Sequence, residues 1–443
     1  INANFIKTGQ LDAGVVRIGP ETTFAPGYDP TKIGNMGVDE RCTALFHFDG
    51  SLNSHKGLTP TFERASVAYL SDGTEVASGQ PRFEDGKFGK GVLIEEGTIN
   101  VFGYPTFDTA SADGGWDHWG AIGSIGTYGQ NTDPDFIFGN QNYSHWVENA
   151  AGATGDFLIH QTPSLGGQPG YSSIIFVCCM ADGSPVTNDK CYPTWNGRDG
   201  GAPNNQWTSI KQIGTSKFYE CRVDGIHQDG TNDLIGVYIK PGNKVYFSRA
   251  QCERKPYATS FTDGTRAGER CTMSPQNILN FEEGTISLWF KPSSAFWKNE
   301  YAAIVNHSTA VNTNEIGLHR YGTSSKLLFC ISNNSANWAG GHFTAVMSTT
   351  DLVADTWYHI VGKWSVAEGK FALYVNGVKE SEANLDASLI PSVMGTFAVG
   401  HHATYPGRES NSLLDELRID KIARTDEEIQ AWYKANAPFY TSE

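Results

Sequence analysis

The stretch GTISLWFKP, residues 284–292, sets the pattern of this chain. Its apolar residues at 286, 288 and 290 alternate with residues that face the other way, which predicts a β-strand. The same period of two recurs in KFALYVNGVKE, residues 370–380, where Asn376-Gly377 supplies a tight turn. Short strands separated by turn signals predict an antiparallel sandwich.

Three further motifs follow in order: DTWYHIVGKWS (355–365), LLDELRID (413–420) and TDEEIQAWY (425–433). Together with residues 284–292 they resemble the laminin-G-like, concanavalin A-like jelly roll. TALFHFDGSLNSHKG and GKFGKGVLIEEG resemble the first two strands of that fold. The resemblance therefore implies one sandwich in two parts, residues 41–98 and 266–443. Thr425 as N-cap and Glu428 as its capping-box partner predict one helix after the last strand.

Residues 99–265 lie between the two parts of that sandwich. They begin with the pattern N-x-x-x-x-P-x-F-D and end with V-Y-F-x-x-x-Q-x-E, which resemble the two ends of a carbohydrate-binding jelly roll of the kind appended to xylanases and glucanases. The termini of a jelly roll lie close together, so such a module can be inserted into a loop of another domain. We therefore predict an all-β chain of two nested antiparallel sandwiches.

Residues 1–40 carry apolar residues in short bursts separated by glycines, and such a segment cannot bury its own faces. One interpretation is a disordered linker, and the other is a short β-rich stem that packs against copies of itself. The segments NANFIKTGQLDA and VRIGPETTFAPGYDP resemble stalk repeats of tail proteins from phages of Gram-positive bacteria. This resemblance implies a homotrimer held by the stem.

Composition limits the class of function. The chain has 443 residues, 12% aromatic and 18% charged, with 49 glycines, which favours β structure with many turns. A net charge of −15 argues against nucleic acid as a partner. No run of 18 apolar residues exists, so no membrane insertion is expected. Because Ile1 is not an initiator Met, we expect a piece of a longer protein.

The eight cysteines show no CxxC spacing, and we expect mostly free, buried thiols. Glucanases on the concanavalin-type sandwich carry E-x-D-x-x-E on one strand, and this chain has no such motif. The adjacent carboxylates Asp415 and Glu416 point to opposite faces of a regular strand, so they cannot flank one glycosidic bond. We therefore predict no catalytic residues and no enzyme.

Sugar binding needs aromatic platforms beside amide and carboxylate groups, because a pyranose has an apolar face and a rim of hydroxyls. Residues 99–265 combine such residues in Gly-rich, polar segments. The predicted carbohydrate-binding residues are Trp116, Trp119, Tyr143, Trp146, Trp195, Asn196 and Trp207.

Calcium is the one cofactor that the sequence suggests, because hard cations take several carboxylate and carbonyl oxygens. The laminin-G-like resemblance implies a structural Ca²⁺ between Asp49 and Asp415, where the first and last strands meet. In the inserted module Asp108 stands where a calcium ligand is common, but the usual partner in the last strand is missing from KVYFSRAQCE. The alternative is that these carboxylates are exposed turn or edge residues.

These observations predict a non-enzymatic, glycan-binding part of a phage tail-tip or fibre protein that recognises host cell-surface polysaccharide, located in the virion tail. One alternative is the accessory carbohydrate-binding region of a secreted polysaccharide-degrading enzyme. The other is a structural spacer without a ligand.

Overall fold

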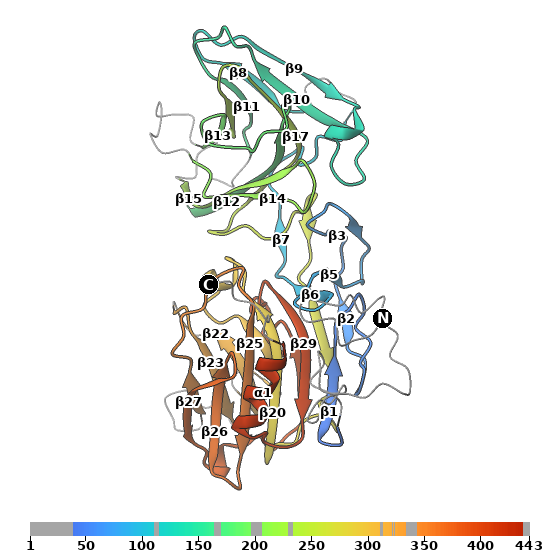
Figure 1. Ribbon diagram of the computed structural model, residues 1–443, viewed down its shortest axis with the longest axis vertical. Helices are drawn as coiled ribbons and strands as arrows, with labels where there is room; N and C mark the ends of the chain where they lie inside the picture. Colours follow the sequence, from blue (N-terminus) through green and yellow to red (C-terminus); the bar gives the residue numbers. More distant parts are fainter. Residues whose placement is uncertain are drawn as a thin grey trace, which may run out of the picture.

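A computed structural model describes residues 39–109, 115–163, 170–195, 206–228, 234–310, 313–320, 322, 324–333 and 343–436. It contains two β-sandwiches stacked along the long axis of the molecule (Figure 1). This confirms the predicted all-β class. The predicted stem, residues 1–40, lies outside the described residues except for Asp39 and Glu40.

The outer sandwich consists of two antiparallel sheets. The first sheet has the order β27 (Val378–Asn384), β26 (Lys370–Val375), β25 (Tyr358–Ser365), β20 (Glu283–Lys291), β29 (Ser412–Asp420), β6 (Lys90–Ile94) and β5 (Arg82–Asp85), and β1 (Cys42–Phe46) also pairs with β29. The second sheet has the order β2 (Thr61–Glu63), β19 (Arg270–Met273), β28 (Thr396–Val399), β21 (Ala303–Ser308), β22 (Glu315–Arg320), β23 (Leu327–Ser332) and β24 (Phe343–Met347).

The inserted sandwich also has two antiparallel sheets. The larger has the order β14 (Ser209–Gln212), β15 (Tyr219–Gln228), β12 (Gly170–Met180), β17 (Asn243–Glu253), β10 (Ser144–Asn149) and β9 (Gly126–Asn131). The smaller has the order β13 (Cys191–Trp195), β16 (Ile235–Ile239), β11 (Phe157–Gln161) and β8 (Asp117–Gly120).

The chain passes between the two sandwiches twice, and the two passages pair. Strand β7 (Thr98–Ile99) leaves the outer sandwich, and β18 (Thr265–Arg266) returns to it as its antiparallel partner (Figure 1). A small hairpin, β3 (Ala68–Tyr69) with β4 (Glu75–Val76), lies beside this crossing. Among the described residues there are three 3-10 turns: η3 (Pro134–Phe136), η4 (Phe296–Lys298) and η5 (Ala387–Leu389).

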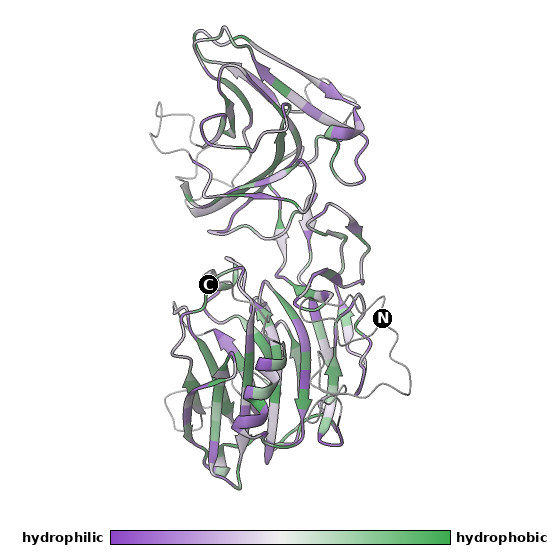
Figure 2. Cartoon of the chain, viewed as in Figure 1, coloured by the Kyte–Doolittle hydropathy of each residue, from purple (hydrophilic) through white to green (hydrophobic). Residues whose placement is uncertain are grey.

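Each sandwich has its own hydrophobic core. In the outer one, the predicted inward residues Ile286, Leu288 and Phe290 are all fully buried. Hydrophobic residues mark the strands of the outer sandwich, whereas β9, at the far end of the inserted one, is hydrophilic (Figure 2). The alternation read from residues 284–292 therefore fixes which face of β20 packs inward.

Helix α1 (Asp426–Asn436) follows the last strand, as predicted. The hydroxyl of Thr425 accepts from the backbone N–H of Glu428 at 3.2 Å, and the Glu428 carboxylate accepts from the N–H of Thr425 at 3.0 Å. This is the expected capping box. Ile429 packs the helix against the outer face of β25 and β26. Among the described residues, no helix has the length and hydrophobicity that crossing a membrane requires.

All eight cysteines are free and buried, in agreement with the prediction. Cys178 and Cys179, adjacent on β12, belong to different hydrophobic clusters on the two faces of that strand. Their thiols fill core space as small hydrophobic groups. Burial also raises the pKa of Cys179 to about 12, so this thiol stays protonated at neutral pH.

A buried ionic cluster, which we name the junction cluster, lies where the chain crosses between the sandwiches. The Arg82 guanidinium contacts Glu95 at 2.8 Å and Glu269 at 2.7 Å. Arg64 pairs with Glu269 at 2.8 Å, and Arg266 pairs with Glu95 at 2.8 Å. The side chains of all three arginines are fully buried. The cluster therefore joins strands β5 and β18 to the segments that follow β2 and β6. It also includes Glu269, the residue before β19.

Glu95 shows how strongly these charges are coupled. Burial alone would raise the pKa of its carboxyl, but Arg266 and Arg82 hold that pKa well below its usual range. Glu95 is therefore ionised at neutral pH. Its negative charge and that of Glu269 compensate arginine charges that would be costly to bury alone.

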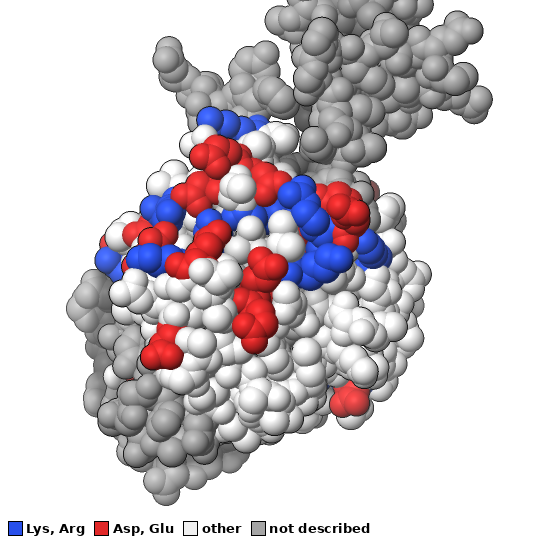
Figure 3. All heavy atoms as spheres, turned by 90° about the horizontal axis from the view of Figure 1, so that it is seen from below, with Lys and Arg blue, Asp and Glu red and all other residues white. Residues whose placement is uncertain are grey.

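On the surface of the outer sandwich, charges of both signs are mixed. Seen from below, Lys and Arg side chains alternate with Asp and Glu in a band across the face, and much of the rest carries neither (Figure 3). Opposite charges at short range offset each other, so this face has no extended patch of one sign.

The junction cluster predicts a large stability effect for a single substitution. Arg82→Met removes the central positive charge and leaves Glu95 and Glu269 incompletely paired, so we expect the free energy of unfolding to fall by about 3–5 kcal/mol. Denaturant titration of the full chain measures this. Lys90→Met is the matched control, because it breaks a pair in the same hairpin with side-chain exposures of 49% and 94%, and we expect a change within about 1 kcal/mol. Equal losses in both variants would contradict the prediction.

Candidate functional site

Two of the predicted sugar platforms are core residues. Trp116 is 2% exposed, stacks on Phe107 and donates its indole N–H to the carbonyl of Tyr104. Trp207 is 5% exposed and donates to the carbonyl of Cys191. Each indole finds a hydrogen-bond acceptor inside the sandwich, so burial leaves no polar group unpaired. Neither ring can present a face to a ligand, which corrects the assignment of Trp116 and Trp207.

The other predicted residues lie apart from one another. Trp119 on β8 is 53% exposed. Trp146 on β10 is half-buried, with the Lys244 ammonium 4.1 Å from its ring centre. Tyr143 is half-buried, and Trp195, at the end of β13, packs partly against the core. Asn196 lies outside the described residues. Of the predicted set, Trp119 is the one with an open aromatic face.

Cross-strand register places Trp119 in a row of side chains on the outer face of the smaller inserted sheet. Trp119 on β8 is opposite Leu158 on β11, which is opposite Tyr238 on β16, which is opposite Tyr192 on β13. Directly paired residues point to the same face of a sheet. Leu158 is buried, and Tyr192 and Tyr238 are half-buried and stack at 5.3 Å. We name this set the aromatic row.

A second row runs beside the aromatic row on the same face. It consists of Asp117, His160, Gly236 and Thr194, from β8, β11, β16 and β13. Asp117 is exposed and His160 is half-buried. Gly236 leaves the middle of the row without a side chain, and an added Cβ there would lie 2.1 Å from the carbonyl oxygen of Ile159. The face therefore combines ring surfaces with a carboxylate and an imidazole.

The electrostatics of this face favour neutral partners. Burial lowers the pKa of His160, so its imidazole is neutral at pH 7 and offers one donor and one acceptor. Burial and a 2.6 Å hydrogen bond to Asp156 raise the pKa of Tyr192, so its hydroxyl stays protonated and donates. Such groups can exchange hydrogen bonds with hydroxyls while the rings lie against C–H surface.

Tyr192 and Tyr238 were not among the residues predicted from the sequence. The signal for them was present in CYPTW (191–195) and IGVYI (235–239), where a tyrosine interrupts an apolar run with period two. The aromatic row also depends on the register between β13, β16, β11 and β8, which the sequence alone does not specify.

The three carboxylates predicted to bind calcium already accept hydrogen bonds from backbone N–H groups. Asp415 is fully buried and accepts from the N–H groups of Lys87 and Phe88 at 2.8 and 2.9 Å, and Asp49 accepts from the N–H of Lys90 at 2.9 Å. In the inserted sandwich, Asp108 accepts likewise from Asn142 and Tyr143.

A calcium ion needs several oxygen ligands around it, whereas the backbone at residues 87–90 and 142–143 points N–H groups at these carboxylates. In particular, residues 86–90 fit tightly against both Asp49 and Asp415. A Cβ at Gly86 would lie 2.7 Å from Asp415 Oδ2, and one at Gly89 would lie 2.2 Å from Asp49 Oδ1. The backbone N–H groups occupy one oxygen of Asp49 and one of Asp415, and Asp415 Oδ1 has no hydrogen-bond partner among the described residues, so calcium binding here stays a prediction.

Burial raises the pKa of Asp415 to about 7, with Glu416 beside it adding to the effect. The unfolded chain has the ordinary carboxyl pKa near 3.8. Between these values the folded state holds the proton and the unfolded state does not, so the contribution of Asp415 to stability falls as pH rises from about 4 to 7.

Asp415→Asn removes this titration. We therefore expect the stability of Asp415→Asn relative to wild type to rise across pH 4–7, with a limiting slope of about 1.4 kcal/mol per pH unit. Denaturant midpoints at several pH values measure it. Asp85→Asn, at an exposed carboxylate of the neighbouring β5, is the control that is expected to follow the wild-type profile. Parallel profiles for Asp415→Asn and wild type would contradict the prediction.

His401 and His402, in the loop after β28, are both fully buried. The ring of His401 hydrogen-bonds to the backbone of Cys271, and Nδ1 of His402 accepts from the N–H groups of Thr404 and Tyr405. Burial lowers the pKa of His401 to about 4 and that of His402 to about 3, so both rings are neutral. They hold the loop in place on the second outer sheet.

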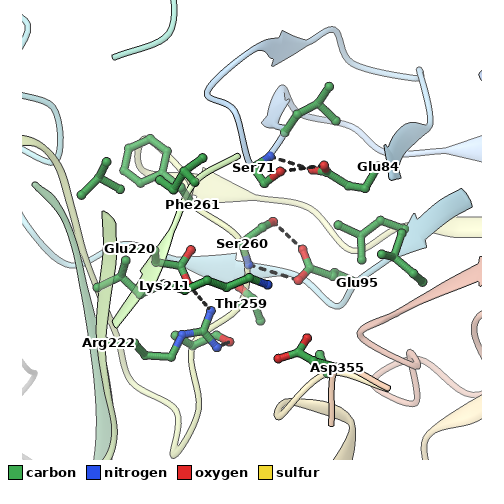
Figure 4. A pocket seen from close by; sticks show the side chains of 18 of the residues that line it. Ser71, Glu84, Glu95, Lys211, Glu220, Arg222, Thr259, Ser260, Phe261 and Asp355 are labelled. Carbon is green, nitrogen blue, oxygen red and sulfur yellow. Dashed lines mark hydrogen bonds and ion pairs between the residues drawn. The ribbon is translucent and has the colours of Figure 1, made fainter. Parts of the chain in front are cut away.

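A cleft of about 370 Å³ lies between the two sandwiches (Figure 4). Lys211, Glu220 and Arg222 line it from the inserted sandwich. Glu84 and Asp355 line it from the outer sandwich. The volume is within the range of small-molecule pockets.

The polar groups of this cleft are largely paired with one another. Glu220 accepts from Arg222, Glu95 accepts from Ser260, and Glu84 accepts from Ser71 (Figure 4). Arg222 also donates to Ser294 of the outer sandwich at 3.2 Å. This arrangement holds the two sandwiches together, and we regard the cleft as their interface.

Residues 263–430 match the family model described as the Concanavalin A-like lectin/glucanases superfamily. The match spans β18 to α1 and confirms the laminin-G-like, concanavalin A-like resemblance of the motifs in that stretch. The second part of the outer sandwich is therefore similar to that superfamily. No curated protein matches the sequence.

Solved structures with a similar arrangement include the botulinum neurotoxin serotype D binding domain, with 16% identity and a TM-score of 0.30, over 38% of this chain and 41% of that one. A second is domain 4 of AbnA, an extracellular arabinanase from Geobacillus stearothermophilus, with 17% identity, a TM-score of 0.30, and coverage of 41% and 83%. A third is the CBM40 of the Ruminococcus gnavus IT-sialidase, with 12% identity, a TM-score of 0.29, and coverage of 34% and 81%. This chain spans about 40% of the length of the neurotoxin binding domains.

Proposed function

We propose that the chain binds a polysaccharide without acting on it, through the outer face of β8, β11, β16 and β13. The observation that carries this proposal is the aromatic row, which aligns Trp119, Tyr238 and Tyr192 beside Asp117 and His160. Rings in a row suit successive sugar units, because each unit has an apolar face. The neutral imidazole can donate to or accept from the rim of hydroxyls, and the Tyr192 hydroxyl, whose proton goes to Asp156, can accept from it.

The match of residues 263–430 to a superfamily that includes lectins supports a binding role for the outer sandwich as well. That superfamily also includes glucanases, so the fold alone does not choose between binding and catalysis. The lack of an E-x-D-x-x-E motif in the sequence favours binding.

The biological setting is the second part of the proposal. The resemblance of residues 1–40 to phage stalk repeats supports a tail-tip or fibre protein that recognises host cell-surface polysaccharide, with a homotrimer formed through the stem. Several weak sugar sites on one trimer would bind a surface far more tightly than a single site. The same aromatic row would serve an accessory region of a secreted polysaccharide-degrading enzyme.

Trp119→Ala tests the binding site. We expect affinity for host cell-wall polysaccharide to fall about tenfold or more, because a central tryptophan at an interface typically contributes about 2 kcal/mol. A glycan array with purified host walls identifies the ligand, and calorimetry measures the affinities. Tyr405→Ala, at an aromatic residue of the outer sandwich that is 44% exposed, is the matched control and should bind like wild type.

Loss of binding in Tyr405→Ala but not in Trp119→Ala would move the site to the outer sandwich. Failure of the wild-type chain to bind host walls and common plant polysaccharides would overturn the proposal in favour of a structural spacer.

Removal of residues 1–38 tests assembly. This truncation keeps Asp39, whose carboxylate pairs with Arg424 at 2.8 Å and anchors the start of the outer sandwich. We expect light scattering to give the mass of three chains for the full sequence and of one chain for the truncated form, since the proposed trimer would bury apolar residues of the stem that a single chain would expose. Identical masses for both would show that the stem does not drive assembly.

A further inference from the structure

A cluster of metal-binding side chains lies on the second outer sheet, away from the aromatic row. Glu315, His319 and Cys330 place a carboxylate oxygen, an imidazole nitrogen and a sulfur within 4.8 Å of one another. Their residues are 3%, 6% and 1% exposed. Sulfur, nitrogen and oxygen ligands in one buried group are the donor types that zinc takes in proteins.

The backbone positions these three side chains by register. Glu315 and His319 each lie two residues from Gly317 on β22, so the three residues face the same side of the sheet, and Gly317 pairs with Cys330 on β23. An added Cβ at Gly317 would lie 2.1 Å from His319 Nε2. The glycine therefore provides the space in which the imidazole turns toward the carboxylate and the thiol.

The three ligand atoms lie within 4.8 Å of one another, and one pair is closer than in a tetrahedral zinc site. Zn–ligand bonds of about 2.0–2.3 Å put neighbouring ligand atoms about 3.3–3.8 Å apart. Here Glu315 Oε1 and His319 Nε2 are 2.8 Å apart, so a bound ion would separate them by roughly half an ångström. Small side-chain rotations on β22 supply such a shift without moving the sheet.

Two buried polar atoms at the cluster have no hydrogen-bond partner among the described residues: Glu315 Oε2 and His402 Nε2. Nδ1 of His402 accepts two backbone hydrogen bonds, so in the neutral ring the proton is on Nε2. That N–H lies 3.7 Å from Glu315 Oε1 and is fully buried. An unpaired donor aimed at a carboxylate is what a metal-bound water would satisfy.

We propose that Glu315, His319 and Cys330 bind one zinc ion, through the carboxylate, Nε2 and Sγ, with a water in the fourth position that accepts a hydrogen bond from His402. Binding displaces the Cys330 thiol proton to solvent and leaves the His319 proton on Nδ1. The charges of one carboxylate, one thiolate and Zn²⁺ then sum to zero, which lowers the cost of burying the Glu315 carboxylate.

The experiment uses the untagged full chain, freed of metal by a chelator and then titrated with Co²⁺ alone. Thiolate-to-cobalt charge transfer reports a sulfur ligand, and Zn²⁺ should displace the cobalt with a stoichiometry of one per chain. Native mass spectrometry counts the zinc independently. We also expect Zn²⁺ to raise the melting temperature, because an ion that binds only the folded chain stabilises it.

Cys330→Ser should abolish the charge-transfer band and weaken zinc binding by about tenfold or more, a loss typical even of residues that only support a ligand. Cys271→Ser is the matched control, since Cys271 is another fully buried thiol of the same sheet, and it should retain the band. His319→Gln, which keeps a polar side chain next to Glu315, is a second variant with the same expected loss of zinc.

The proposal is overturned if the wild-type chain binds no metal, or if Cys330→Ser and His319→Gln bind zinc as tightly as wild type. A cobalt band that persists in Cys330→Ser and disappears in Cys271→Ser would overturn it as well. Zinc binding and glycan binding are measured separately, so neither result decides the other.

Discussion

The position of the inserted sandwich depends on charges that are neutralised inside the protein. Arg82 lies between Glu95 and Glu269, where water cannot reach any of the three side chains freely. Such a group is stabilising only when every partner is present. The partners come from segments on both sides of the insertion, so the cluster forms only when the chain has left the outer sandwich and returned to it at the correct place. Correct closure of the outer sandwich and placement of the insertion are thus one event.

The motifs that resembled the two ends of a carbohydrate-binding module lie where the chain leaves the outer sandwich and returns to it. Asn100 donates to the carbonyls of Ala250 and Thr262. Gln251 accepts from the N–H of Thr262, and the buried carboxylate of Glu253 accepts from the N–H of Thr259. Asn100 binds the outgoing segment to the last strand of the inserted sandwich, and Gln251 and Glu253 bind that strand to the returning segment. Their role is to hold the two ends of the module together, which is the condition for inserting it into a loop.

What the sequence predicted well was local. The period of two in residues 284–292 and the Thr425–Glu428 capping box each depend on residues a few positions apart. What it missed joins distant residues: Arg82 and Glu269 are 187 positions apart, and the aromatic row needs the register of four strands. Trp116 has the composition of a platform, yet a carbonyl inside the sandwich accepts its N–H and makes burial favourable.

The paired passages β7 and β18 have a mechanical consequence. The inserted sandwich is joined to the outer one by two covalent connections that run side by side, so a pull on the insertion is divided between them. A pull along the outer sandwich alone, from β1 to β29, passes through neighbouring strands of one sheet and does not enter the insertion. The inserted sandwich can therefore keep its shape, and any surface it presents, while its carrier is under tension.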